Sequence, residues 1–269
     1  MSTDQATDHF RAWAGAMLAR HRHRHRAGEG GAGQSSTVYQ TSTMAALLDG
    51  IYDGDVTIAE LLTHGDFGLG TFNHLDGEMV ILDGTCYHLR ADGSATVAAP
   101  EDKTPFAAVL WFRPDKTINI TGLSDRAALT GLVDSATPSP NLTYALRVSG
   151  SFARVRTRTV MAQRPPYPPL TEATADEPFT DLEHVTGTLA GFRTPAYEQG
   201  ISVAGDHLHF LTEDRRHGGH ALDFALDHGD VTICTASEFH LSLPRTGPFL
   251  SADLSPADTN AQINQTEGD

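Results

Sequence analysis

Hydrophobic residues between positions 37 and 250 occur in short runs separated by glycine, proline and aspartate. Runs of this kind, bounded by turn residues, are typical of β-strands, and Asp76-Gly77 is a strong signal for a hairpin turn between two of them. One long run, residues 141–160, is expected to break at Gly150. The pattern predicts strands at residues 37–41, 78–82, 85–89, 95–98, 106–112, 117–122, 141–160, 183–189, 200–203, 230–234 and 238–243, and residues 65–70 are read as a glycine-rich interruption.

Helical signals are fewer and shorter. Residues 44–52 are predicted to form a short apolar helix or a turn, and residues 57–63 a helix introduced by Asp55. Residues 125–132 form the clearest candidate, because Ser124 or Asp125 can accept hydrogen bonds from the first amide groups of a helix. Many strands with a few short helices predict an α/β fold of the mixed, α+β kind.

The proline-dense segment at residues 163–170 cannot form a central strand, because proline has no amide hydrogen to donate. It is the best candidate for a domain boundary. Residues 77–89 and 200–211 also share an order of glycine, apolar strand, turn and histidine-bearing strand, which suggests an internal duplication. We therefore expect two similar sheet-rich subdomains, at residues 37–163 and 164–250, followed by a polar tail at residues 251–269.

Residues 1–36 have a different composition. A short amphipathic segment is followed by alternating histidine and arginine at residues 21–26 and by a glycine-rich stretch. The interleaved arginines oppose a bound cation, and the glycines provide no rigid frame. We interpret these residues as a flexible His/Arg/Gly-rich extension with weak, adventitious metal affinity.

The chain has 269 residues and a formal net charge of -15, so it would repel phosphate backbones, and nucleic acid is not an expected partner. No apolar run is long enough to span a bilayer, so no membrane association is expected, and a cytoplasmic location follows. Cys86 and Cys234 lie far apart in strand-like runs. Two buried free thiols are the simplest expectation, and a single disulfide remains an alternative.

The most distinctive chemistry lies in residues 206–224. His207 and His209 are two positions apart in an apolar run, and alternate side chains of a strand project from the same face. A polar turn at residues 212–219 leads into a second apolar run that begins with His220, so a hairpin can bring the three imidazoles together. Such a trio can form a catalytic metal site with open coordination positions, although a histidine on a strand can also be an ordinary core or surface residue.

His217 and His228 are alternative ligands in the same region, and both are expected to be exposed in turns. The cupins provide one comparison, because Gly200, His207, His209 and Glu213 approach their first motif. Their second motif is not recognisable downstream, and His220 follows too early for the cupin pattern. A cupin-like metal-dependent oxygenase or isomerase is therefore an alternative reading of the histidine pair.

A broader similarity extends over nearly all of the chain after residue 36. Several blocks agree in order and spacing with the α-acetolactate decarboxylase family, which the sequence resembles. The matching blocks are residues 37–40, 68–72, 75–78, 156–160, 166–170, 191–193 and 218–220, and the terminal Glu267-Gly268.

The resemblance implies a carboxy-lyase that converts 2-acetolactate stereospecifically to acetoin and CO2, a reaction of acetoin biosynthesis and the butanediol pathway, in a homodimer. It also implies that the tail at residues 251–269 contributes to the active site. It implies zinc as the metal and His207, His209 and His220 as its ligands. Three-histidine sites also accept iron, cobalt or nickel, so the sequence alone does not determine the metal. The resemblance further places the essential carboxylates at Glu78 and Glu267, and the essential arginine at Arg158.

These residue types suit the chemistry. A cation chelated by the hydroxyl and ketone oxygens of the substrate can stabilise an enediolate after CO2 leaves, so no organic electron sink is needed. Arg158 can pair with the substrate carboxylate, Glu78 and Glu267 can divide the proton-transfer roles, and Thr71 is a candidate for the pocket wall. Glycines at residues 65–70 do not form a dinucleotide fingerprint. The remaining alternative is a non-catalytic module that binds a metal or small molecule, which would need no proton donor.

Overall fold

The computed structural model describes residues 36–255 and 258–267, which belong to one compact unit. The expected flexible extension at residues 1–36 lies outside the described residues, apart from Ser36. The strands are β1 (Ser36–Thr41), β2 (Val56–Thr57), β3 (Phe67–Thr71), β4 (Glu78–Leu82), β5 (Thr85–Leu89), β6 (Ala95–Val97), β7 (Lys103–Thr104), β8 (Ala107–Leu110), β9 (Lys116–Leu123), β10 (Thr143–Arg158), β11 (Phe179–Thr194), β12 (Gly205–Thr212) and β13 (Gly218–Ser242). The helices are α2 (Met44–Leu48), α3 (Ile58–Leu61), α4 (Arg126–Ala136), α5 (Leu170–Ala173), α6 (Gly247–Ser251) and α7 (Thr259–Glu267), with two short 3-10 turns at Asn73–Leu75 and Ala196–Glu198.

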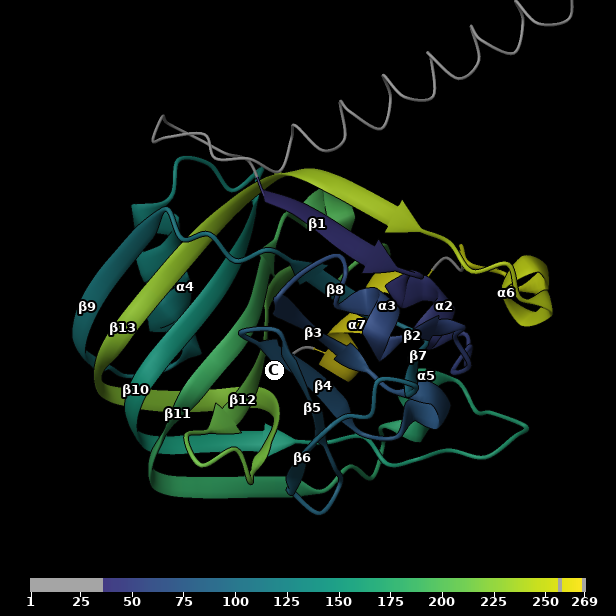
Figure 1. Cartoon of the computed structure of the whole chain (residues 1–269), viewed down its shortest axis with the longest axis horizontal. Coiled ribbons are helices and arrows are strands. Elements are labelled where there is room, and N and C mark those ends of the chain that lie inside the picture. The colour runs from purple at the N-terminus through teal and green to yellow at the C-terminus, as the bar shows by residue number, and fades with distance from the viewer. Residues whose placement is uncertain (1–35, 256–257, 268–269) are drawn as a thin grey trace, which may run out of the picture. The chain divides into compact units, whose positions relative to one another are not determined.

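Eleven of the strands form one continuous sheet, in the order β10-β11-β12-β13-β1-β8-β3-β4-β5-β6, with β9 added alongside β13. The long strands β9 to β13 curve together on the left of Figure 1, and the shorter strands β3 to β6 lie on the right. Strand β1 joins the two groups, because it pairs in parallel with the end of β13 and antiparallel with β8. The mixed, sheet-rich fold with a few short helices is therefore confirmed.

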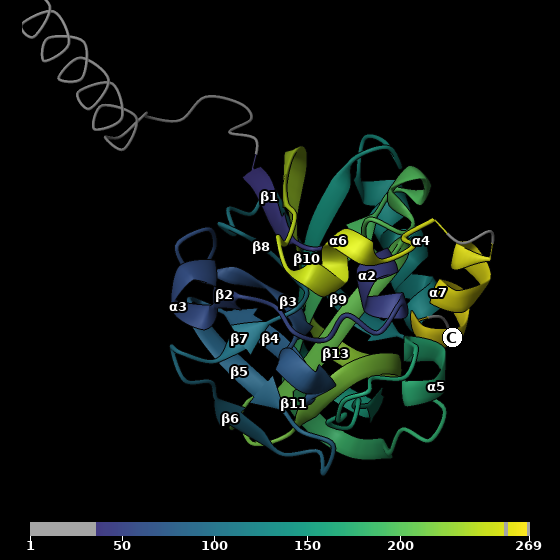
Figure 2. The same ribbon diagram turned by 90° about the vertical axis from the view of Figure 1, so that its right-hand side faces the viewer.

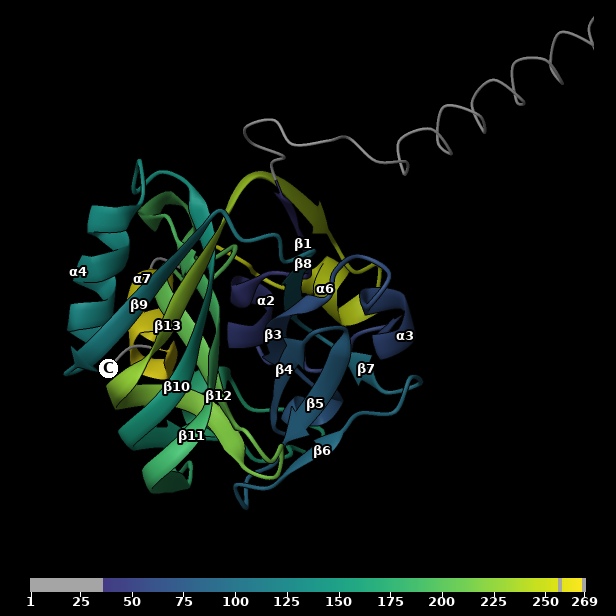
Figure 3. The same cartoon turned by 60° about the vertical axis from the view of Figure 1, so that its left-hand side comes forward.

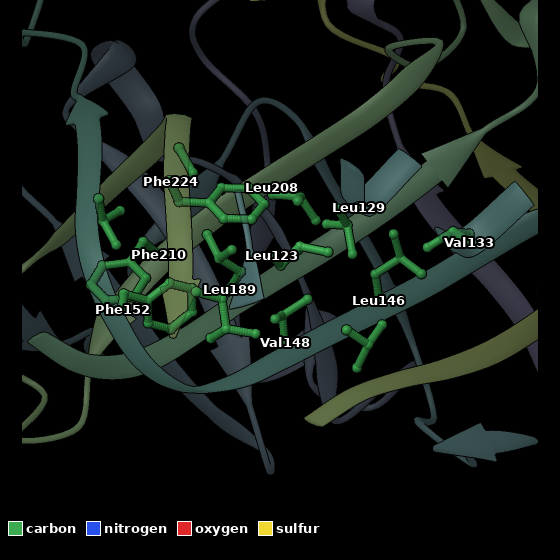
Figure 4. Close-up of a cluster of buried hydrophobic side chains, with 14 of the residues drawn as sticks. Leu123, Leu129, Val133, Leu146, Val148, Phe152, Leu189, Leu208, Phe210 and Phe224 are labelled. Carbon is green, nitrogen blue, oxygen red and sulfur yellow. The ribbon is translucent and has the colours of Figure 1, made fainter. Parts of the chain in front are cut away.

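The long strands are covered on both faces. Helix α4 packs on one face, as Figure 3 shows, and its Leu129 and Val133 lie beside Leu146 of β10 in the cluster drawn in Figure 4. Side chains of the other face, including Ala145 and Phe192, pack instead against residues of β3 and β4. Each fully buried aliphatic or aromatic side chain contributes roughly 1.5–3 kcal/mol to stability. The long strands are thus a rigid layer between α4 and the short strands.

Several strands agree closely with the sequence pattern, and β4 and β5 have the predicted bounds. The strand predicted at residues 200–203 is wrong, because these residues form a turn in which Gly200 has a positive φ of 93°. Gly150 does not break β10 either. A side chain at residue 150 would collide with the carbonyl of His228, so this glycine permits close approach of β10 and β13.

The two similar subdomains predicted from the sequence need correction. Strand β10 precedes the proline-dense segment and pairs with both β11 and β13, which follow it. A boundary at residue 164 would therefore cut through one sheet. The suggested duplication also fails at the level of strands, because residues 78–89 contain the hairpin β4–β5 whereas residues 200–211 contain a turn and one strand.

Helix capping and the C-terminal tail differ in part from the predictions. Asp125 caps α4 as expected, whereas α3 is capped by Thr57 and not by Asp55. The tail forms helix α7, which the sequence did not predict. Figure 2 shows α7 near α2 and α5, and its Ile263 is buried in a cluster with residues of both helices. The tail is thereby anchored to the rest of the fold.

Two further expectations concern the environment of the chain. Among the described residues, no helix combines the length and apolar character that crossing a bilayer requires. In the described part of the chain, Cys86 and Cys234 are both buried and form no disulfide, which excludes the alternative of a bridge between them.

Candidate metal centre

The three candidate ligands lie on one hairpin, as predicted. His207 and His209 are in β12, and His220 is near the start of β13. In the antiparallel pairing of these strands, His209 lies directly opposite His220. The hydroxyl of Thr212 stabilises the intervening turn, because it donates to Asp214 and accepts from backbone amides of residues 216 and 217. The turn thus fixes the register that brings the histidines together.

One nitrogen of each histidine lies within 4.8 Å of the other two. The ring centroids are 5.1, 5.1 and 5.4 Å apart, so the rings converge without stacking. All three side chains are buried. Burial lowers the pKa of His209 to about 4, and burial together with the neighbouring histidines lowers the pKa values of His207 and His220 well below the usual range. The three imidazoles are therefore neutral at physiological pH, which is the state that binds metal ions.

The hydrogen bonds of the site leave lone pairs available for an ion. Nδ1 of His209 lies 2.7 Å from the carbonyl oxygen of Met79 and donates to it, so Nε2 of the neutral ring carries the lone pair. Nε2 of His209 and Nε2 of His220 are buried and have no hydrogen-bond partner among the described residues. A buried unpaired polar atom is costly, and a bound cation would satisfy both of these nitrogens. The donor set fits a metal ion.

The rival histidines lie elsewhere. His217 and His228 are both exposed, as expected. His228 is, however, within the continuous strand β13 and not in a turn, since it pairs with Thr121 of β9. Neither histidine belongs to the cluster of possible ligands in the described part of the chain.

Two buried carboxyl groups lie next to the histidines. Oε2 of Glu267, in the last described turn of α7, is 3.5 Å from Nε2 of His207 and 3.8 Å from Nδ1 of His220. Oε2 of Glu78, at the start of β4, is 3.7 Å from Nε2 of His209. The two carboxyl groups therefore approach the histidines from different elements of the fold.

Both carboxyl groups hold protons more tightly than usual. Burial raises the pKa of Glu267 to about 7, and the charge of Glu177 adds to this shift while Arg158 opposes it. Burial, followed by repulsion from Glu267 and Glu177, raises the pKa of Glu78 well above the usual range. Two carboxyl groups so close to each other resist losing both protons, which suits proton transfer.

Arg158 reaches the same place from β10. It pairs with His220 in the β10–β13 ladder, and its Nη2 donates to the carbonyl of Thr266. Arg154, Arg156 and Arg158 occupy alternate positions of β10. Arg154 forms an ion pair with Asp223 and Arg156 with Asp181, and both pairs are exposed. The structure therefore separates Arg158, whose side chain is largely buried, from its two exposed neighbours.

Thr71 is buried and lies opposite Glu78 in the β3–β4 pairing. Its hydroxyl donates to the carbonyl oxygen of Gly77 at 2.6 Å. This contact holds the turn that delivers Glu78 to the site. Because the hydroxyl is engaged with backbone, a direct contact of Thr71 with substrate stays a prediction.

Sequence reasoning missed other parts of the site. Glu177 is buried beside Arg158, and no motif marks it among the several acidic residues of its segment. Arg126 of α4 lines a cavity of about 410 Å³ together with Asp206 and with Glu267, the carboxyl group nearest His207. The other residues that line this cavity are Ala127, Thr130, Arg193, Val203, Ala204, Gly205, Ile263 and Asn264.

The fold and the site together define a mixed, sheet-rich protein with a cluster of three histidines that could hold a metal ion, beside two carboxyl groups and an arginine. The model of the family described as alpha-acetolactate decarboxylase matches residues 38–256. The chain belongs to this family, which confirms the resemblance found in the sequence.

Similar proteins agree with this assignment. The chain is 48% identical over 232 residues to an alpha-acetolactate decarboxylase of Klebsiella aerogenes, covering 86% of this chain and 89% of the relative. It is 46% identical to the protein of the same name from Bacillus subtilis strain 168, covering 87% and 91% of the two chains. The crystal structure of the Bacillus subtilis protein matches with a TM-score of 0.85 and 45% identity, over 87% of this chain and all 100% of that one.

Proposed function

We propose that this protein decarboxylates 2-acetolactate to acetoin and CO2, with a metal ion held by His207, His209 and His220. Zinc is the ion proposed, because neutral imidazole ligands with open positions suit it and because the family resemblance implies it. The observation that carries the proposal is the convergence of three buried, neutral histidines with two protonatable carboxyl groups, in a chain of this family.

The metal would supply Lewis acidity for the electron pair that remains on carbon when CO2 leaves. The carboxylate of the substrate needs a cationic partner while it is bound. Arg158 is suited to this role, since its guanidinium lies in the site and is largely shielded from water, with only 13% of its side chain exposed. The arginine would orient the bond that breaks and would release CO2 once the negative charge has moved onto carbon.

Product formation requires a proton at the carbon atom that lost CO2. Glu78 and Glu267 are the candidate donors, because their raised pKa values keep a proton available near neutral pH. They reach the histidines from different elements, so a substrate held between them would present a different face to each. Delivery by one carboxyl group alone would give a single acetoin enantiomer.

Racemic 2-acetolactate is the substrate for the decisive assay. Purified protein is expected to form acetoin and CO2 with excess of one acetoin enantiomer, and a chelator should abolish the reaction. Protein that contains the metal but forms no acetoin would contradict the proposal, and would indicate a non-catalytic binding module.

We also propose a cytoplasmic homodimer. The two buried cysteines, which form no disulfide in the described part of the chain, support a reducing compartment. Exposed apolar side chains at the end of β13, Phe239 and Leu243, support a contact with a second copy. Light scattering of the purified protein tests the dimer, and a monomer at micromolar concentration would contradict it.

A further inference from the structure

Glu177 is a buried acidic residue that the proposed chemistry does not use. It lies in the connection between α5 and β11, and only 3% of its side chain is exposed. Burial raises the pKa of Glu177 to about 7, while Arg158 acts in the opposite direction. Burying a carboxylate opposes folding, so the position of Glu177 calls for a function beyond packing.

The contact of Glu177 is with Arg158. Oε2 of Glu177 lies 3.2 Å from Nε of Arg158. Oε2 has no hydrogen-bond partner among the described residues, Arg158 included. The interaction is therefore chiefly an attraction of charges in a place with little water, where such attractions are weakly screened.

A second group holds the guanidinium. Nη2 of Arg158 donates to the carbonyl oxygen of Thr266, in α7. Glu177 and Thr266 thus engage two different nitrogens of the same guanidinium, and they belong to elements far apart in the chain. Because an arginine side chain has many rotamers, two such anchors restrict its plane to one orientation.

The guanidinium is held beside the candidate site. Arg158 lies opposite His220 in the β10–β13 pairing, and its Nη2 donates to the carbonyl of Thr266, the residue before Glu267. An arginine that is pre-oriented in this way loses little freedom when an anion binds. Misplacement of the same group would weaken both binding and orientation of a substrate carboxylate.

We propose that Glu177 is a positioning residue for Arg158, which with the carbonyl of Thr266 fixes the guanidinium for binding the substrate carboxylate. This inference deepens the proposed function and rests on it. Glu177 touches the arginine and not the reacting atoms, so its effect on turnover passes through Arg158.

The test is a double-mutant cycle that compares the wild type, Glu177→Gln, Arg158→Ala and the double variant. Each protein is assayed for kcat, KM and metal content. Glu177→Gln is expected to lower kcat/KM by about 10- to 100-fold with the metal retained, as is typical when a supporting residue is lost. In the Arg158→Ala background the same substitution should change kcat/KM by less than about twofold, because the group it positions is gone. A purely structural role would give the same loss in both backgrounds.

Asp176→Asn is the matched control, since Asp176 is the preceding residue, is exposed and loses the same charge. This control should retain full activity. Glu177→Asp provides a second variant if the glutamine variant does not fold: it keeps the charge but shortens the side chain, and kcat/KM should still fall by more than about fivefold.

Wild-type kcat and KM in the Glu177 variants would overturn the positioning role. The same would follow if the loss of kcat/KM in the double variant equalled the product of the losses in Glu177→Gln and Arg158→Ala. Wild-type protein and the Asp176→Asn control that both fail to form acetoin would overturn the proposed function itself, so the two failures are distinguishable.

Discussion

Oε2 of Glu267 lies 3.5 Å from Nε2 of His207, although the two residues belong to separate elements at the end of α7 and in β12. Helix α7 is anchored by the buried Ile263 and Thr266, and its Thr266 carbonyl also accepts a hydrogen bond from Arg158. Helix α7 therefore lies at the candidate site, where it places one carboxyl group beside a histidine and also holds the arginine.

The first prediction concerns this helix. Glu267→Gln should keep the metal and lower kcat, because a proton-bearing group is lost while the histidines remain. Truncation before Gln265 should lower kcat further, since it also removes the carbonyl that holds Arg158. Acetoin assays with metal analysis test both, and Gln265→Ala, at an exposed position of the same helix, is the control. Equal activity of the truncated and full-length proteins would contradict a role for α7.

The second prediction concerns Glu78 and Arg158. Glu78→Gln and Arg158→Ala should each retain the metal and reduce turnover by roughly 10²–10⁴-fold, the range typical of positioned acids and bases and of groups that stabilise charge. Arg156→Ala is the matched control for Arg158→Ala, because Arg156 lies two residues earlier in β10 but forms an ion pair with Asp181 at the surface. Full activity of Glu78→Gln would remove Glu78 from the mechanism.

The third prediction concerns retention of the metal at low pH. An exposed histidine binds a proton as the pH falls through about 6.5. Burial lowers the pKa of His209 to about 4 and shifts His207 and His220 in the same direction, so protons compete with the metal only at lower pH. Protein dialysed at pH 5.5 should keep its metal. Loss of the metal with a midpoint near pH 6.5 would show that the histidines titrate as exposed groups.

The fourth prediction concerns the pH dependence of kcat. The raised pKa values of Glu78 and Glu267 mean that the protonated form persists to neutral pH and is lost as the pH rises. We expect kcat to fall on the alkaline side with an apparent pKa that belongs to the pair, and a bound dication would move it downward. The apparent pKa of this alkaline decline should change in Glu78→Gln or in Glu267→Gln. An unchanged pH profile in both variants would exclude the pair as proton donor.

The sequence predicted the parts of the site that depend on local spacing. His207 and His209 share a face because strand side chains alternate, and the polar turn after Thr212 brings His220 opposite His209. Glu78 follows the Asp76-Gly77 turn into a strand with the predicted bounds. Local patterns of this kind contain enough information, since few residues separate the groups that must meet.

Longer-range features were not predictable in this way. Helix α7 has a polar sequence with a weak apolar stripe, and it is stabilised by contacts of Ile263 with distant helices. Strands β10 and β13 continue through Gly150 and His228, where the sequence indicates a break and a turn. They can do so because the two backbones approach each other closely at these positions. Glu177 has no local signal at all, and only the three-dimensional structure places it beside Arg158.

Removal and return of the metal is the most direct test of the central claim, that three neutral histidines hold the ion on which decarboxylation depends. Metal-free protein should form no acetoin, and zinc should restore the reaction in the wild type and in His217→Ala, an exposed residue of the same hairpin. His220→Ala should bind the metal poorly and regain little activity. Undiminished acetoin formation by metal-free protein would contradict the account.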